Sequence, residues 1–271
     1  MRTLWKGALS FGLVTVPVRL YPATLDKSPS FHQLRASDHS RIGYQRVAKS
    51  DGEKVEYDDI EKGYEYERDR YVVFDRDELD ALKPPSSRTV EIQQFVPLEQ
   101  IDPVYFQRPY YLAPEPTGAK AYGLLAEAMR DRNAVAICKI TLRDREHLAT
   151  LRLRGELLVL ETMHWPDEIR EVSLSDLDVD EIPQPRDQEV AMARTLIESL
   201  TEDFDPSAYT DEYRQKVEEA VTAKIEGQEV TVVEQPGEPA GVVDLMEALK
   251  RSVDQSRERR AAGDGEAAEA S

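Results

Sequence analysis

The sequence is poor in the residues from which most metal and disulfide sites are built. Its 271 residues include one cysteine and four histidines. A single cysteine cannot form an internal disulfide framework or a cysteine-based zinc cluster, so the chain fits a reducing cytoplasm. The histidines, His32, His39, His147 and His164, are scattered, and none stands in a recognised zinc-binding motif. We therefore expect no metal and no other cofactor.

Catalytic motifs and long hydrophobic runs are also missing. The chain has no Gly-rich phosphate loop, no nucleophile elbow and no HExxH sequence. Asp176, Asp178 and Asp180 imitate the first half of a calcium loop, but Glu181 stands where glycine must turn the chain. No stretch approaches the roughly 18 apolar residues of a membrane helix. These absences favour a protein that is neither an enzyme nor a membrane protein, with a metal-dependent nuclease or other hydrolase as the alternative.

Positive charge is gathered in two parts of the chain, although the whole molecule carries a formal charge of -18. Residues 1–50 hold eight Lys or Arg against two acidic residues, and residues 128–160 hold seven against four. Residues 1–160 are neutral in sum, so the entire -18 belongs to the last 111 residues. A cationic surface joined to an acidic, solvated extension is typical of a protein that binds a polyanion. Charge alone also allows an ordinary soluble surface without a partner.

Short stretches of alternating apolar and polar residues run through the first 180 residues. Val14, Val16, Val18 and Leu20 share one side of a strand expected at 14–20. Similar patterns predict strands at 71–74, 88–96, 135–142, 148–154 and 156–162, and one amphipathic helix follows Gly118. The Asp-Gly sequence at 51–52 predicts a hairpin turn between 41–49 and 54–57. Many short strands indicate a mainly β barrel or sandwich.

Several residues in these stretches stand out for their chemistry. Cys138 lies inside an alternating run, so we interpret it as a buried structural thiol. Lys139, Arg143, Arg152 and Arg154 fall on one alternating face of their strands, which predicts a cationic sheet face. The segment 35–49 interleaves basic residues with Tyr44, a composition suited to following a nucleic-acid backbone.

Beyond Pro183 and Pro185 the pattern changes to helices. Val190, Ala193, Ile197 and Leu200 form one apolar stripe, and Tyr213, Val217, Val221 and Ile225 form another, with Thr210 as the expected N-cap of the second helix. Such stripes need a cover, either their own barrel or another subunit. After a linker of flexible composition, a third stripe runs from Val242 to Val253. It suits a peptide that docks in a partner's groove or a helix that folds back on its own domain.

With these residues in view, the stretch LWKGALSFGLVTVPVRLY at 4–21 resembles the opening of bacterial Ku, the end-binding protein of non-homologous end joining. Further matches follow in the same order: FH at 31–32, RIGY at 41–44, EKGYEY at 61–66, PYYL at 109–112, KAYGLL at 120–125 and DLMEAL at 244–249. Together they span about residues 4–253. The resemblance departs at the end of the chain, where an acidic tail replaces the lysine-rich tail of some members.

The resemblance implies a β-barrel core with a long bridge-forming insertion, then an α-helical dimerisation arm and a short C-terminal helix, α+β overall. Two subunits would close a ring over a duplex end, in the bacterial cytoplasm or nucleoid and without enzymatic activity. The implied parts are a core at 1–184 with the insertion at about 33–75, an arm at 185–227, a linker at 228–241, and a recruiting helix with a disordered tail at 242–271.

The resemblance also assigns residues to these roles. Double-stranded DNA would be held by Arg35, Arg41, Arg46, Lys49, Lys54, Lys139, Arg143 and Arg145. The arm of the homodimer would use Val190, Ile197, Leu200, Tyr213, Val217 and Val221. An ATP-dependent bacterial DNA ligase D would be recruited through Leu245, Met246, Leu249 and Val253. A pure adaptor that joins proteins through this last helix, with negligible affinity for DNA, is the remaining alternative.

Overall fold

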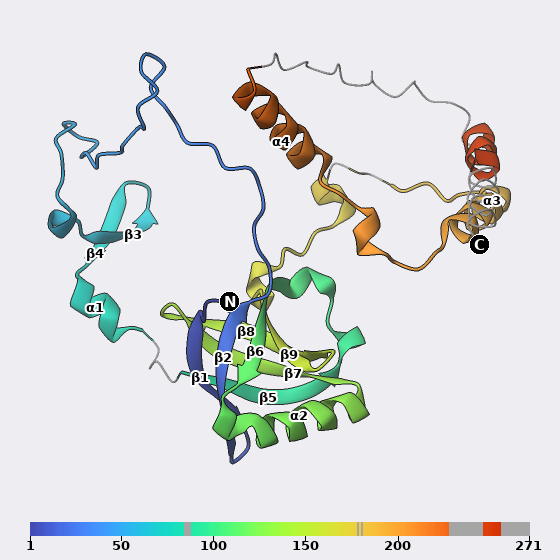
Figure 1. Cartoon of the computed structure of the whole chain (residues 1–271), viewed down its shortest axis with the longest axis horizontal. Coiled ribbons are helices and arrows are strands. Elements are labelled where there is room, and N and C mark those ends of the chain that lie inside the picture. Colours follow the sequence, from blue (N-terminus) through green and yellow to red (C-terminus); the bar gives the residue numbers. More distant parts are fainter. Residues whose placement is uncertain (84–87, 178, 180, 228–245, 256–271) are drawn as a thin grey trace. The chain divides into compact units, whose positions relative to one another are not determined.

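The computed structural model describes residues 1–83, 88–177, 179, 181–227 and 246–255 (Figure 1). Its internal contacts divide the chain into two units, Met1–Glu171 and Val172–Ser271. The boundary that we expect at 184/185 between core and arm stays a prediction, and the expected linker at 228–241 lies outside the described residues. None of the described helices combines the length and the apolar character that crossing a membrane requires.

A closed barrel forms the centre of the first unit, with strand order β1-β2-β6-β9-β8-β7-β5. The strands are β1 (Trp5–Phe11), β2 (Val14–Pro22), β5 (Thr89–Pro97), β6 (Phe106–Pro114), β7 (Ala134–Leu142), β8 (Arg145–Arg154) and β9 (Leu157–Met163). Neighbours pair antiparallel except β1 and β5, which close the barrel in parallel and place Leu9 beside Val90. The β-barrel with helical additions predicted from the sequence is thus confirmed.

Alternation along the strands fills the barrel with apolar side chains. Val16, Val18 and Leu20 of β2 are fully buried, as their period of two predicted. Cys138 of β7 is fully buried too, and burial raises the pKa of its thiol to about 12. A thiol that stays protonated at neutral pH is a poor nucleophile, so its interpretation as a structural residue is confirmed.

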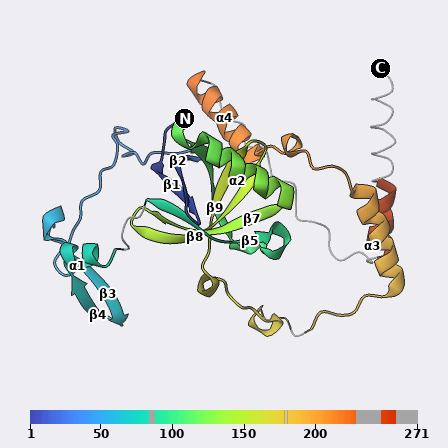
Figure 2. The same ribbon diagram turned by 90° about the horizontal axis from the view of Figure 1, so that it is seen from below.

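Helix α2 (Ala119–Arg132) packs against one end of the barrel (Figure 2). The hydroxyl of Tyr122 donates a hydrogen bond to the carbonyl of Leu112 at 2.7 Å and accepts one from the amide of Leu158 at 2.7 Å. Burial raises the pKa of this phenol, which keeps it a donor. Because Leu112 lies near the end of β6 and Leu158 near the start of β9, α2 covers this end of the barrel. The opposite strand ends stay uncovered by α2.

Between β2 and β5 the chain forms a separate two-stranded sheet of β3 (Lys62–Glu67) and β4 (Arg70–Phe74), followed by α1 (Arg76–Ala81). The hairpin turn expected at 51–52 is present, since Gly52 has a φ of 76° and the amide of Ala48 donates to the carbonyl of Glu53 at 2.8 Å. The longer strands expected on either side are wrong, because only a single bridge, Val47 to Lys54, connects them. These flanks are almost wholly exposed, so no buried face extends their pairing.

The second unit contains α3 (Asp187–Leu200), α4 (Glu212–Ile225) and a helix at 246–255. Both predicted apolar stripes therefore lie on helices. The expected N-cap is wrong by one residue: Asp211, not Thr210, caps α4, and its carboxylate accepts a hydrogen bond from the amide of Arg214 at 3.0 Å. A carboxylate at this position also interacts favourably with the helix dipole.

Short 3-10 helices lie at Tyr57–Asp59, Leu98–Gln100, Pro103–Tyr105, Pro116–Gly118, Pro166–Glu168, Leu174–Leu177 and Pro206–Ala208.

Candidate nucleic-acid interface

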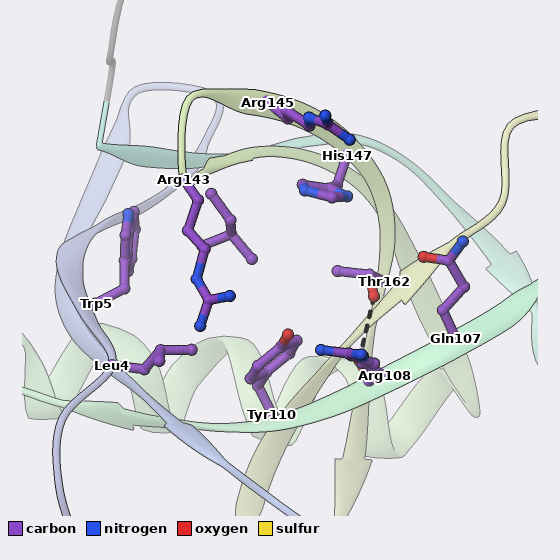
Figure 3. A pocket seen from close by; sticks show the side chains of 10 residues that line it. Leu4, Trp5, Gln107, Arg108, Tyr110, Arg143, Arg145, His147 and Thr162 are labelled. Atoms are coloured by element: carbon purple, nitrogen blue, oxygen red, sulfur yellow. Dashed lines mark hydrogen bonds between the residues drawn. The ribbon is translucent and has the colours of Figure 1, made fainter. Parts of the chain in front are cut away.

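A cavity of about 590 Å³ opens at the barrel end opposite α2 (Figure 3). The strand ends that meet there are the start of β1, the start of β6, the turn between β7 and β8, and the end of β9. We call this cavity the barrel-end pocket; its lining is Leu4, Trp5, Gln107, Arg108, Tyr110, Leu142, Arg143, Arg145, His147 and Thr162. Three of these ten side chains are guanidiniums and none is a carboxylate, so the pocket is suited to an anion.

The guanidiniums in the barrel-end pocket lack the ion pairs that neutralise other arginines of the barrel. Elsewhere Arg19 binds Glu115 at 3.0 Å and Arg152 binds Glu161 at 3.2 Å. Within the part of the chain that the structure describes, no carboxylate lies within ion-pair distance of Arg108, Arg143 or Arg145. Unpaired guanidiniums keep their full capacity to bind phosphate oxygens, often with two parallel hydrogen bonds.

Two nearby carboxylates are held by lysines instead of by these arginines. Asp144 binds the ammonium of Lys83 at 3.0 Å, and Glu146 binds that of Lys139 at 3.1 Å. Hydrogen bonds from Lys83 to Asp80 and Asp144 raise the pKa of Lys83, which keeps it charged. The alternation of β8 then leaves Arg145 and His147 on the pocket side of the strand (Figure 3). The two carboxylates next in sequence to Arg143 and Arg145 are thus paired with lysines and do not line the pocket.

The turn between β7 and β8 presents Arg143 in an unusual backbone conformation. Leu142 pairs with Arg145, and the two residues between them, Arg143 and Asp144, have φ values of 50° and 65°. Two-residue hairpins use such positive φ values, but a side chain with a Cβ atom is disfavoured there by about 1–2 kcal/mol. The guanidinium of Arg143 extends from this turn over the opening, near Leu4 and Tyr110 (Figure 3).

Of the eight basic residues assigned from the sequence, Arg143 and Arg145 meet in the barrel-end pocket. Arg108, Gln107 and His147 lie there too and were not predicted as site residues. Arg108 belongs to β6, a strand that its two prolines and a bulge near Phe106 hide from pattern analysis. The sequence would have indicated Arg108 as a site residue only if β6 had been recognised as a strand, because its pairing with β9 brings Arg108 to the same barrel end.

The predicted cationic sheet face is wrong as a whole, because acidic residues share it. Lys139 is paired with Glu146 and Arg152 with Glu161. The pattern of one strand does not reveal the charges that the neighbouring strands bring to the same face. Lys139 also lies over the ring of Trp165, 5.7 Å from its centroid. Its role in binding DNA stays a prediction.

Two of the basic residues predicted in the insertion make local ion pairs. Arg35 donates from its Nε to Asp38 Oδ1 at 2.9 Å and makes a second contact with Oδ2, and Arg35 holds the pKa of Asp38 far below its usual range. Lys54 binds Glu56 at 2.6 Å. Exposed ion pairs contribute only about 0–1 kcal/mol, so a polyanion can compete for both cations.

The other predicted residues of the insertion are less neutralised. Arg41 and Lys49 are exposed, and neither has an ion-pair partner among the described residues. Arg46 stacks over the ring of Tyr57, with its guanidinium carbon 5.4 Å from the centroid. Their assignment to DNA stays a prediction, since none of them lines the barrel-end pocket.

Helices α3 and α4 of the second unit present apolar side chains to solvent. Ile197 of α3 is 65% exposed and Tyr213 of α4 is 66% exposed. Of the other predicted arm residues, Leu200 and Val221 are exposed, and Val190 and Val217 are half-buried. Apolar stripes on isolated helices gain most of their stability when another surface covers them.

The helix at 246–255 does not present its apolar stripe in the same way. It runs beside α3 in both views of the second unit (Figure 1, Figure 2), and Val253 is only 6% exposed. Met246 and Leu249 are half-buried, and Leu245 lies outside the described residues. The described members of the stripe are therefore half-buried or buried within this chain, in agreement with the alternative of a helix that folds back.

Comparisons with known proteins agree with this fold. The family model described as "Ku70/Ku80 beta-barrel domain" matches residues 10–192. A "Non-homologous end joining protein Ku" of Frankia casuarinae is 49% identical over 96% of this chain, which spans 65% of that relative's length. A "Non-homologous end joining protein Ku 2" of Saccharopolyspora erythraea is 46% identical over 96% of this chain and 86% of its own length.

A third relative extends the match to another bacterium. The "Non-homologous end joining protein Ku" of Desulfitobacterium hafniense is 44% identical over 97% of this chain and 92% of its own length. These matches include the closed barrel, the insertion and the helices of the second unit. On the barrel, the family model and these relatives together, the chain belongs to the Ku family.

Proposed function

We propose that this protein binds the ends of double-stranded DNA in non-homologous end joining, without reading their sequence and without enzymatic activity. The observation that carries the proposal is the barrel-end pocket, whose three unpaired guanidiniums match the phosphates of DNA, in a chain whose relatives are named for this repair process. Phosphate contacts hold a duplex in position but carry no sequence information. Binding by charge therefore suits a protein that must accept any broken end.

The proposal includes a homodimeric ring, in which two copies surround the duplex, protect its end and bridge it to another. The exposed apolar stripes of α3 and α4 support this part, because a second copy is the surface that would cover them. A closed ring can load only from a free end. That restriction explains how a protein without base contacts can distinguish a break from intact DNA.

The test of the proposal compares a linear duplex with a covalently closed circle of the same sequence. We expect the purified protein to shift the linear duplex and to bind the circle at least roughly tenfold more weakly. Affinity for the linear duplex should fall as salt rises, with a slope near -0.9 per neutralised phosphate. Gel shifts over a salt series measure both. Equal binding to the circle would refute the ring, and cleavage that depends on added Mg²⁺ would favour a nuclease.

Arg143, in the turn between β7 and β8, allows a test that separates DNA binding from folding. Replacing Arg143→Gly should weaken binding to linear duplex about tenfold, because one charge-assisted phosphate contact is lost. The free energy of unfolding should rise by no more than about 1 kcal/mol, because glycine relieves the strain of about 1–2 kcal/mol at this positive φ but has greater freedom in the unfolded chain, which costs about 0.5–1 kcal/mol. Fluorescence anisotropy and thermal denaturation measure the two effects. The variant Arg143→Lys keeps the charge and should retain most of the affinity; unchanged binding by Arg143→Gly would remove this residue from the interface.

We further propose that the C-terminal stripe recruits an ATP-dependent bacterial DNA ligase D. Its support is an amphipathic helix that follows a stretch of linker-like composition. Because Val253 is only 6% exposed, binding the ligase would require this helix to leave its position beside α3. Removing residues 241–271 should spare end binding and abolish stimulation of ligation, measured on linear DNA with the purified ligase. Removing only 256–271 is the matched control and should keep the stimulation. Loss of end binding in the longer deletion, or full stimulation without the helix, would contradict this role.

A further inference from the structure

The interior of the barrel-end pocket has a shape that a continuous duplex backbone does not fit, although such a backbone can reach Arg143 at the opening (Figure 3). Its volume of about 590 Å³ falls within the range of small-molecule sites, roughly 300–1,000 Å³. A second hollow of about 510 Å³ adjoins it and shares Leu4, Gln107, Arg108, Tyr110 and Arg143. The outside of a duplex is a convex cylinder, so a phosphate in the middle of a strand approaches a surface rather than entering a cavity. A strand terminus or a free nucleotide can enter.

The charge of the pocket exceeds what one backbone phosphate requires. A phosphodiester carries a single negative charge, whereas a phosphomonoester carries about -1.5 to -2 at neutral pH and presents three strong acceptor oxygens. Arg108, Arg143 and Arg145 provide three guanidiniums from β6, the β7–β8 turn and β8. His147 and Gln107 add side chains that can donate hydrogen bonds. The lining thus presents donors from several strands around one opening, with more positive charge than a single diester requires.

The described carboxylates near the barrel-end pocket do not line it. Asp144 and Glu146, the nearest carboxylates in sequence to the pocket arginines, are bound by Lys83 and Lys139. The adjoining hollow contributes one carboxylate, Asp26, whose pKa is lowered by hydrogen bonds from Ser28. That acid lies in the second hollow and does not line the first.

Apolar and aromatic groups complete the lining. Trp5 and Tyr110 flank the opening, with Leu4 between them on the same side as the Arg143 guanidinium (Figure 3). Aromatic rings bind bases and sugars through their faces and tolerate any base. Cations beside aromatic rings are the combination that a nucleoside carrying a phosphate requires.

We propose that the barrel-end pocket binds a phosphomonoester, the phosphate of a single nucleotide, either at the 5′ terminus of a DNA strand or free in solution. If the phosphate belongs to a DNA terminus, this inference rests on the proposed end binding. It adds that the protein distinguishes a phosphorylated end from an unphosphorylated one. For the free source it does not depend on DNA. In both cases Arg108 and Arg145 bind the phosphate oxygens, and Trp5 and Tyr110 contact the nucleoside.

The first experiment uses a DNA hairpin with one open end, made with either a 5′-phosphate or a 5′-hydroxyl. The loop blocks the other end, so both hairpins offer the protein one end and the same number of diesters. We expect the phosphorylated hairpin to bind roughly tenfold more tightly in fluorescence anisotropy. Arg108→Gln should reduce this ratio to about one, because the phosphorylated hairpin loses far more affinity than the hydroxyl hairpin. Arg145→Gln provides a second, independent variant.

Arg130→Gln is the matched control, since it removes the same charge from α2 at the opposite end of the barrel, where Arg130 is paired with Glu127. It should keep the full preference for the phosphate. The second experiment titrates the protein with deoxyadenosine monophosphate and with inorganic phosphate by calorimetry. Binding in wild type that disappears in Arg108→Gln supports the pocket as a phosphomonoester site independently of DNA.

The outcomes separate the two proposals. A phosphate preference that Arg108→Gln removes supports the DNA terminus as source, and binding of the free nucleotide alone supports the free source. Equal binding of both hairpins with no free-nucleotide binding overturns the pocket assignment and leaves end binding intact. Equal weakening of both hairpins by Arg108→Gln also overturns it, because the pocket then contacts ordinary diesters. If neither hairpin binds, the proposed function fails, and the calorimetric titration alone decides on the pocket.

Discussion

Replacing Ile197 and Tyr213 together by aspartate should convert the proposed homodimer to a monomer and lower its affinity for linear duplex at least about 100-fold. Both side chains are largely exposed in the single chain, at 65% and 66%, so the helices themselves should tolerate the change. In a dimer the same positions would become buried, where an unpaired carboxylate is strongly unfavourable. The loss of affinity follows because an open half-ring releases the DNA that a closed ring retains. Light scattering and fluorescence anisotropy measure the two effects.

The control adds the same two charges to the other side of the same helices. Gln188 of α3 and Gln215 of α4 are both exposed and lie on the faces opposite Ile197 and Tyr213. The double variant Gln188→Asp with Gln215→Asp should remain dimeric and bind ends normally. A dimer that survives the Ile197 and Tyr213 changes would show that these stripes have another partner.

Replacing Gly7→Ala should destabilise the barrel by at least about 3 kcal/mol, a large effect for one methyl group. A Cβ atom at Gly7 would lie 2.0 Å from the carbonyl oxygen of Arg88 and 2.3 Å from the ring of Trp5. That carbonyl accepts the hydrogen bond from the amide of Ala8 at 2.8 Å, beside the parallel β1–β5 pairing that closes the barrel. The backbone cannot move away without opening this closure. Melting temperature should fall by roughly 6–12 °C.

Gly123→Ala is the control for this variant. Gly123 is exposed on α2, and a Cβ atom there would have no neighbour within 4 Å. Alanine should stabilise the helix by about 0.5–1 kcal/mol, because it restricts the unfolded chain and favours the helix. In differential scanning calorimetry the melting temperature should fall for Gly7→Ala and rise for Gly123→Ala. Equal melting temperatures would mean that the β1–β5 closure yields to the added methyl group.

Much of the architecture could be predicted from local patterns. The alternation at 14–20 and 135–142 corresponds to β2 and β7, and the spacing after Gly118 corresponds to α2. Each of these elements buries one face, so apolar residues recur along the sequence with the period of the strand or the helix. β6 was missed because Pro109 and Pro114 interrupt its pattern, although it pairs with β2 and β9. The strands expected around Gly52 fail for the opposite reason, since a turn signal alone does not provide a buried face.

The sequence by itself determined the barrel strands β2, β5, β7, β8 and β9, the helical stripes, the separation of charge and the membership of a family, because each depends on residues close together in the chain. Only the tertiary structure decided which cations act together. Arg143 and Arg145 join Arg108 because antiparallel pairing brings the start of β6 and the β7–β8 turn to one barrel end. Glu146 pairs with Lys139 because the neighbouring strands β7 and β8 bring both side chains to the same face. Charge can be counted along a sequence, but the pairing that neutralises it, or leaves it free for a ligand, depends on strand register.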